Sequence, residues 1–156
     1  MTQGTIGRIE TVDSGAAARQ ALGRFTVATP GPGFTEVTGD VARWAAGTGI
    51  GSGILTLFCR HTSASLTIQE NADPDVRRDL ASALDRLAPR QAPYVHRTEG
   101  PDDMPAHIRT MLTGASLSIP VLGGRLALGT WQGIYVVEHR DVPHRREIVL
   151  HVIGAA

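Results

Sequence analysis

The sequence contains no lysine, because all 15 of its basic residues are arginine. A Schiff-base lysine and the phosphate-binding lysine of a P-loop are therefore excluded, and any phosphate must be held by arginine forks or backbone amides. The sequence also lacks the GxGxxG pattern of dinucleotide-binding proteins and the G-x-S-x-G turn of α/β-hydrolases. The sequence therefore shows none of these common signatures of a catalytic site.

Neither sign of charge is in excess, since 15 basic residues balance 15 acidic ones. A neutral chain has no overall field that attracts nucleic acid or an anionic membrane surface, so we expect neither as a partner. Cys59 is the only cysteine, and the chain shows no signal peptide or apolar run of membrane-spanning length. We therefore expect a cytoplasmic protein in which Cys59 is a small buried core residue rather than a ligand or nucleophile.

The length of 156 residues suits one domain with a substantial core. Residues 1–19 carry few large apolar side chains, so we expect an N-terminal extension that is partly disordered and a folded domain over 20–156. Residues 54–62 indicate a central strand that is buried on both faces until it emerges at His61. A short strand is expected at 24–29.

The remaining pattern predicts three helices and a run of strands. Thr38 is a plausible N-cap for a short helix, Asp73 and Pro74 start a helix that reaches about Ala88, and Asp103 caps a third that Gly114 closes. Period-two alternation then predicts four strands: 115–122, 125–132, 134–140 and 145–153. Together these elements predict a single α+β domain, mainly antiparallel β-sheet or sandwich with a few helices packed on it.

Polar residues cluster in the stretch HTSASLTIQEN, which follows the expected central strand, and such a stretch usually meets a ligand or a partner chain. His61 lies at the strand end, His96 in a polar loop and His107 on the inward face of the third helix. Three imidazoles from three elements is the form of a catalytic zinc site, although separate structural or surface histidines fit the spacing too. Ser63 could be a nucleophile, but a strand-end hydroxyl that bonds to the backbone explains it as easily.

Three further features of the sequence each allow two interpretations. Glu70 and Asn71 either form a turn or bind a metal or an amine. Residues 129–133 (GTWQG) indicate either a bulge or a ligand contact. The charged residues around the last turn indicate either a solvated hairpin end or a phosphate clamp; they are Glu138, Arg140, Arg145 and Arg146.

Several motifs together closely resemble the YjbQ family, often labelled secondary thiamine-phosphate synthase. The resemblance covers about residues 20–154 and rests on HTSASLTIQENADPDVRRDL, YVHRTEGPDDMPAHI, SLSIPV, GRLALGTWQGI and EHR followed by RR. It implies an α+β homotrimer with a polar pocket near the trimer contacts. Many members have an acidic residue and a Gly-Pro-Arg turn where this chain has His139 and Val142-Pro143-His144, which weakens the case for an anion clamp.

The resemblance implies a thiamine-phosphate synthase-type transferase that joins a hydroxymethylpyrimidine diphosphate to a thiazole phosphate, with pyrophosphate released. The alternatives are a metal-dependent hydrolase that uses three histidines and a non-catalytic trimeric binding protein. A divalent metal, Zn or Mg, is expected on His61, His96 and His107. Expected catalytic residues are His61, Glu70, Asn71, Glu99, Asp103 and Gln132. Expected contacts to a small phosphorylated substrate are Thr62, Ser63, Thr130, Trp131, Glu138, Arg145 and Arg146.

Overall fold

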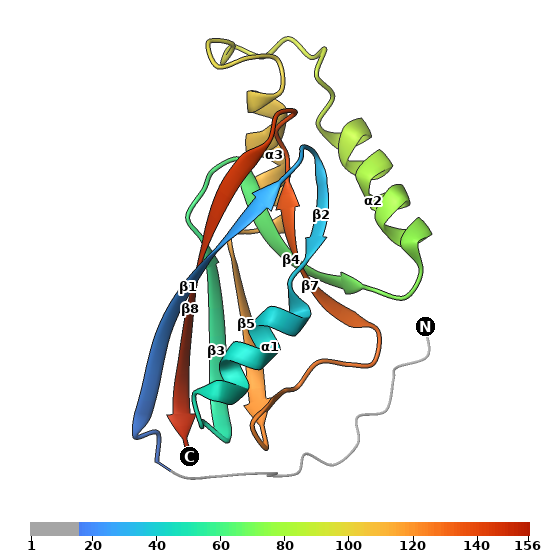
Figure 1. Ribbon diagram of the computed structural model, residues 1–156. Helices are drawn as coiled ribbons and strands as arrows, with labels where there is room; N and C mark the ends of the chain where they lie inside the picture. The colour runs from blue at the N-terminus through green and yellow to red at the C-terminus, as the bar shows by residue number, and fades with distance from the viewer. Residues whose placement is uncertain (1–15) are drawn as a thin grey trace, which may run out of the picture.

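Eight strands and three helices make up the part of the chain that the computed structural model describes, residues 16–156 (Figure 1). The strands are β1 (Arg19–Thr29), β2 (Gly33–Glu36), β3 (Ser52–Cys59), β4 (Ala64–Glu70), β5 (Ser116–Leu122), β6 (Arg125–Leu126), β7 (Gln132–Glu138) and β8 (His144–Ala155). The helices are α1 (Thr38–Gly47), α2 (Pro74–Leu87) and α3 (Asp103–Thr113). Of the expected N-terminal extension, residues 1–15 lie outside the described part.

The strands form two antiparallel sheets, one in the order β1-β8-β3-β5-β6 and one in the order β2-β7-β4. Their facing sides share one core, because Leu55 and Leu57 of β3 pack in the same buried cluster as Leu66 of β4 and Ile134 of β7. Helix α1 adds Val41 to this cluster. The expected single α+β domain, mainly antiparallel sheet with helices packed on it, is confirmed.

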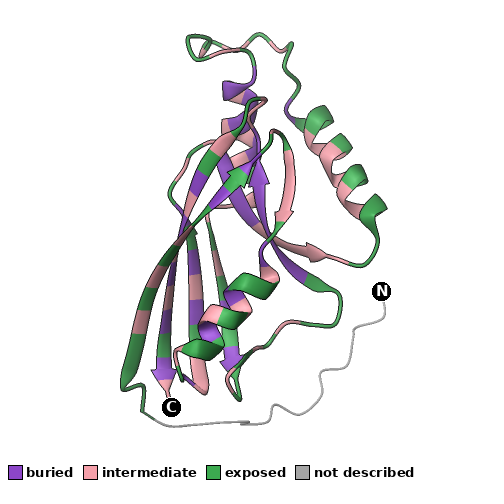
Figure 2. Ribbon diagram, viewed as in Figure 1, coloured by how far each residue is buried: buried purple, intermediate pink, exposed green. Residues whose placement is uncertain are grey.

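The far face of the smaller sheet turns toward α2 and α3. Alternation along β7 places Ile134 and Val136 in the shared core and leaves Tyr135 and Val137 on the opposite face. Tyr135 contacts α2 there, since its hydroxyl accepts a hydrogen bond from Arg77 at 3.1 Å. Helix α2 has no buried residue, as Figure 2 shows, so its apolar stripe is only partly covered in one chain.

Local signals account for the ends of α2 and α3. The Asp73 side chain accepts a hydrogen bond from the Asp75 amide at 2.8 Å, and Pro74 is the first helical residue, as predicted. Gly114 ends α3 at a φ of 100°, which a side chain would disfavour. Gly123 and Gly124 both have positive φ and form the expected tight turn between β5 and β6.

Three expectations about the strands were wrong. Strand β3 is buried on one face only, because Ile54 and Phe58 point away from the core and are 42% and 49% exposed. The polar stretch after His61 is itself mostly strand, since β4 pairs with β7 along its whole length. Strand β6 ends at Leu126 rather than at 132, because the chain then crosses to the second sheet.

Two helix assignments also need correction. The inward face expected for α3 carried His107, but the His107 side chain is 34% exposed and the buried face instead carries Pro105, Ala106 and Arg109. Asp103 is the first residue of α3 and not its cap, so its carboxylate is available for other contacts. Within the described residues, no helix is both long and apolar enough to cross a bilayer.

Candidate functional site

A pocket of about 820 Å³, lined by both polar and apolar residues, lies where β3 ends and the chain turns into β4. The turn supplies His61, Thr62 and Ser63, α3 supplies His107, and β8 supplies Arg146. Phe58 and Met111 form an apolar side of the same pocket. The sequence therefore brings five of the expected polar residues, from three separate segments, to one place.

His61 is held as a hydrogen-bond donor to this pocket. Its Nε2 accepts a hydrogen bond from the Glu147 backbone N–H at 2.8 Å, so the lone pair of Nε2 is occupied and the ring proton sits on Nδ1. Burial lowers the pKa of His61, and the positive charge of Arg146 lowers it further. The ring is therefore neutral, and it offers an N–H group rather than a lone pair.

The Arg146 side chain is held by hydrogen bonds to other residues of the protein, without any ligand. Its guanidinium donates to both carboxylate oxygens of Glu138, at 2.7 Å and 2.5 Å, and to the Ser63 hydroxyl at 3.1 Å. Thr29 donates to the same carboxylate at 2.6 Å. Burial opposes ionisation of Glu138, but the hydrogen bonds from Arg146 and Thr29 outweigh it and lower the pKa of Glu138. Arg146 thus positions Ser63 and neutralises Glu138.

Arg145 does not join Arg146 in the pocket. Consecutive residues of a strand point to opposite faces, and β8 turns Arg146 inward and Arg145 to solvent. The expected pair of arginines on one phosphate is therefore not formed within one chain.

A second group of side chains converges beside the pocket, at the start of α3. His96 Nε2 lies 2.8 Å from Asp103 Oδ2, and His107 Nε2 lies 3.1 Å from the same oxygen. Among the described residues, this is the group whose nitrogen and oxygen atoms are placed to hold a metal ion. His61 lies outside this group, so the expected three-histidine set is not assembled within one chain.

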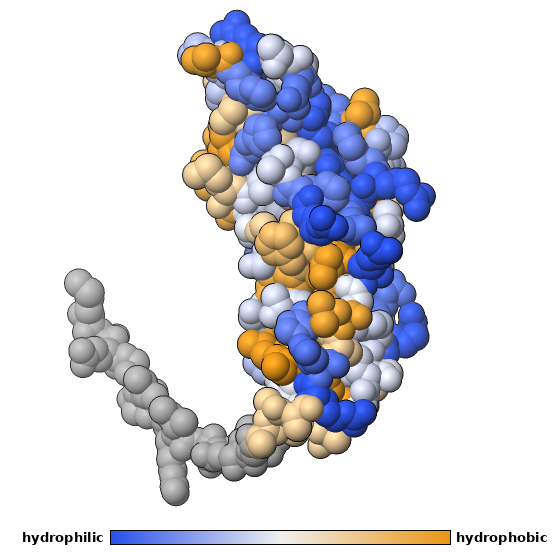
Figure 3. Space-filling model, turned by 90° about the vertical axis from the view of Figure 1, so that its left-hand side faces the viewer, coloured by the Kyte–Doolittle hydropathy of each residue, from blue (hydrophilic) through white to orange (hydrophobic). Residues whose placement is uncertain are grey.

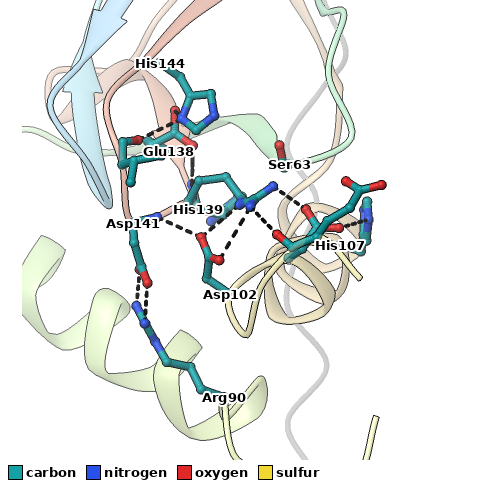
Figure 4. A network of polar contacts seen from close by, with 12 residues as sticks. Ser63, Arg90, Asp102, His107, Glu138, His139, Asp141 and His144 are labelled. Atoms are coloured by element: carbon teal, nitrogen blue, oxygen red, sulfur yellow. Dashed lines mark hydrogen bonds and ion pairs between the residues drawn. The ribbon is translucent and has the colours of Figure 1, made fainter. Parts of the chain in front are cut away.

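Arg140 fixes the acidic part of this group. It donates to Asp103 Oδ1 at 2.5 Å and to Asp102 Oδ2 at 2.8 Å. Burial opposes ionisation of Asp103, but the hydrogen bond with His96 and the charge of Arg140 prevail and lower its pKa. Figure 4 shows Asp102 between the helix that carries His107 and the turn that carries Asp141, whose carboxylate pairs with Arg90.

The remaining expected residues lie at the other end of β4. The backbone N–H of Asn71 donates to the backbone carbonyl of Trp131 at 3.0 Å, and Glu70 pairs with Gln132 across the sheet. Trp131 is 63% exposed, and its neighbour Thr130 is exposed as well. Seven residues of strand, about 23 Å at about 3.3 Å per residue, separate this group from Ser63. One small ligand therefore cannot touch both groups within one chain.

Comparison with known proteins identifies the relationships of the chain. The family model described as UPF0047 protein YjbQ-like matches residues 23–155. A UPF0047 protein of Synechocystis is 48% identical over 144 residues, which cover 92% of this chain and 98% of the relative. YjbQ of Escherichia coli O157:H7 is 42% identical over 131 residues, covering 83% and 95%. The chain belongs to the YjbQ/UPF0047 family.

Solved structures of this family share the fold. A hypothetical protein from Aeropyrum pernix K1 aligns with a TM-score of 0.79 at 35% identity and covers 86% of this chain and 98% of its own. A protein of the YjbQ/UPF0047 family from Clostridium acetobutylicum aligns with a TM-score of 0.77 at 38% identity and covers 83% and 98%.

The structure of this YjbQ family member also uses residues that the sequence did not single out. Asp102 is buried and anchors Arg140, although the Asp102-Asp103 pair ahead of a helix first looks like simple capping. His139 is buried, and its Nε2 lies 2.8 Å from the Ser65 hydroxyl. Glu99 touches the site only through its backbone carbonyl, which accepts from Arg140. The pKa of Arg140 is raised by its hydrogen bond to Asp102 and, more weakly, by the charge of the Glu99 side chain, which the sequence predicted to be catalytic.

Proposed function

We propose that the chain is an enzyme that acts on a small phosphorylated substrate in the pocket between His61 and His107. The observation that carries this proposal is the His61 imidazole, whose Nδ1–H is left as a donor by the bond from the Glu147 amide. Arg60 adds a guanidinium to the same pocket; it pairs with Glu147 at 2.6 Å and is 60% exposed, so its remaining N–H groups can reach a ligand. Donors and a cation suit a phosphate group.

The specific reaction that we propose is thiamine-phosphate synthesis, at the low rate of a secondary activity. The thiazole nitrogen forms a bond to the methylene carbon of hydroxymethylpyrimidine diphosphate while the bond from that carbon to the diphosphate oxygen breaks. Pyrophosphate leaves with the bonding electrons, so the transition state gains negative charge on the leaving oxygen. His61 and Arg60 stabilise that charge, and a divalent metal held beside His107 would supply further positive charge to the leaving group.

We further propose that the protein is a homotrimer. The outer face of the larger sheet exposes an apolar row across three strands, from Ile153 of β8 through Ile54 of β3 to Pro120 of β5. Leu22, Phe58 and Leu122 add to this face and are 69%, 49% and 43% exposed. Figure 3, viewed from the side of β1, shows hydrophobic residues gathered between hydrophilic ones. An apolar sheet face of this kind favours burial against another copy.

A metal-dependent hydrolase is the second candidate, because the His96, Asp103 and His107 group lies beside the pocket. The general bases expected for it fit poorly within one chain, since Glu70 lies at the far end of β4 and the Glu99 side chain is exposed. A non-catalytic trimeric binding protein is the third possibility. These three candidate functions are told apart by the product that forms, or by the absence of any product.

A thiochrome assay for thiamine phosphate tests the proposal. Purified protein from a strain without the primary synthase is incubated with the pyrimidine diphosphate and the thiazole phosphate. We expect product, and a loss of about 100-fold in kcat for His61→Phe, which removes the N–H donor and keeps the ring volume. Arg43→Ala is the control, because Arg43 pairs with Asp40 on the exposed side of α1, away from the pocket.

Two results would contradict the synthase proposal. Turnover of the diphosphate at an equal rate without the thiazole acceptor would make the protein a hydrolase. Tight binding of either substrate without any product would make it a binding protein.

A further inference from the structure

The contacts of His107 decide which nitrogen of its neutral ring carries the proton and which carries the lone pair. His107 Nδ1 lies 3.0 Å from the Thr62 carbonyl oxygen, and a carbonyl oxygen can only accept a hydrogen bond, so the proton is on Nδ1. Neutral His107 then presents the lone pair of Nε2 to Asp103 Oδ2 at 3.1 Å. Two electron pairs at that distance repel each other unless a cation lies between them.

His96 adds a third group to the same point. Its Nε2 lies 2.8 Å from Asp103 Oδ2, and its ring centroid is 5.6 Å from that of His107. We propose that His96 Nε2, Asp103 Oδ2 and His107 Nε2 bind one zinc-like divalent cation, with a fourth position left for water or substrate. The proposal deepens the function proposed above by assigning the ligands of its metal, and it excludes His61 from that set.

Two of the three spacings between the ligand atoms need only a small adjustment, and all three atoms lie within 4.8 Å of one another. Ligands of a tetrahedral ion at about 2.0–2.1 Å lie about 3.3 Å from one another. The two observed contacts, 2.8 Å and 3.1 Å, are shorter by a few tenths of an ångström. His96 comes from a loop and can retreat, whereas Asp103 and His107 lie one turn apart on α3 and are held at that spacing.

Both of the more rigid ligands are supported from behind, as metal ligands usually are. The Thr62 carbonyl fixes the ring of His107 and the position of its proton. Arg140 binds Asp103 Oδ1, so Oδ2 is the oxygen left to face the two imidazoles. The Asp103 side chain is only 3% exposed, so its charge is poorly compensated by water and favours a bound cation.

The ligand types select the cation. Two imidazoles and one carboxylate suit Zn²⁺ and similar borderline ions, whereas Mg²⁺ prefers oxygen ligands and retains several waters. The His96 and His107 side chains are 37% and 34% exposed, so an ion has a path to them. His107 also lines the substrate pocket, so the fourth ligand position can be occupied by a substrate phosphate.

His61 cannot complete this set in the structure that we describe. A metal needs an imidazole lone pair, and the lone pair of His61 is on Nε2 and accepts the Glu147 amide proton. The proposed centre is thus the His96, Asp103 and His107 group and not the three-histidine group expected from the sequence.

Metal binding by the intact protein tests the centre without reference to any reaction. Protein freed of metal with a chelator is titrated with Zn²⁺, Mg²⁺ and Co²⁺ in a calorimeter. We expect one equivalent of Zn²⁺ per chain, Co²⁺ absorption bands of a tetrahedral site, and no binding of Mg²⁺ under the same conditions. His96→Gln and His107→Gln each weaken Zn²⁺ binding by about 100-fold or more, and Arg140→Lys weakens it by about 10-fold.

Controls separate this centre from its rivals. His61→Ala and His151→Ala should bind Zn²⁺ as the parent protein does, and circular dichroism of each variant reports whether it folds. Loss of binding in His61→Ala, or full binding in both glutamine variants, would overturn the assignment. Absence of Zn²⁺ binding in the folded parent would show that His107 is instead an imidazolium paired with Asp103. Stoichiometric zinc without thiamine phosphate would retain the centre and refute the synthase proposal alone.

Discussion

Arg146 and Glu138 form a two-bonded ion pair that joins the two sheets of the sandwich. Arg146 extends from β8 in the larger sheet, and Glu138 ends β7 in the smaller one. Both side chains are almost fully buried, at 5% and 1% exposure. The pair therefore lies inside the protein, where the loss of one partner leaves an uncompensated charge.

Replacement of Arg146 should destabilise the fold strongly. Arg146→Ala leaves Glu138 buried without its partner, so we expect the free energy of unfolding to fall by about 3–5 kcal/mol. Arg145→Ala, one residue earlier on the exposed face of β8, should change it by about 0.5 kcal/mol or less. Urea denaturation of both variants measures the difference. Equal effects at the two positions would contradict the buried pair.

His139 should make the protein less stable in weak acid. Burial lowers the pKa of His139 from 6.5 to about 4, and the charge of Arg109 adds to the effect. Between these values the unfolded chain binds a proton that the native protein does not, so stability rises with pH across this window. We expect stability to fall by about 3 kcal/mol from pH 7 to pH 4 on account of this residue.

Urea denaturation across that pH range, beside His139→Gln, measures the contribution. The glutamine can still bond to Ser65 but does not titrate, so its stability should depend less on pH. A proton NMR titration that placed the pKa of His139 at or above 6 would show that the ring is not held neutral by burial.

A charge on the outer face of the larger sheet should prevent assembly. Ile54→Asp introduces a carboxylate beside Ile153, in the apolar row that we propose to be buried between copies. We expect sedimentation velocity to show a trimer for the parent protein and a chain of 16.6 kDa for the variant. Val95→Asp is a matched control, because Val95 is 99% exposed and lies far from that row in the sequence. A monomeric parent would refute the trimer.

Cys59 should react slowly with thiol reagents while the protein is folded. Burial raises the pKa of the thiol, and its S–H donates to the Ala64 carbonyl at 3.5 Å. Both effects reduce the thiolate, which is the reactive form. We expect a chromogenic disulfide reagent to label Cys59 at a rate that increases steeply in urea. Rapid labelling in buffer would mean that the end of β3 opens readily.

The sequence predicted the elements whose signals are local. Asp73 and Pro74 mark the start of α2, and Gly114 marks the end of α3, because capping depends on adjacent residues alone. The position of β4 was not predicted, because Ser65 is polar and yet buried. Its hydroxyl is satisfied by His139, which is 74 residues away in the sequence. A pattern of apolar residues cannot reveal that kind of partner.

The candidate site was predicted in its residue types and only partly in its arrangement. His96 and His107 converge as expected, but through Asp103, because α3 places Asp103 and His107 one turn apart. The separation of Ser63 from Asn71 follows from the pairing of β4 with β7 along all of β4. Hydrogen-bond register of that kind is a property of the folded sheet, and no spacing in the sequence contains it.

Strand β4 also makes the polar groups at its two ends energetically independent of each other. The two polar groups at its ends share no contact within one chain, so the free-energy effects of Ser63→Ala and Asn71→Ala on ligand binding should simply add. A coupling energy measured between the two positions would therefore be evidence that a second copy of the chain brings the two groups to one ligand. A double-mutant cycle across this single strand thus tests the trimer that we propose.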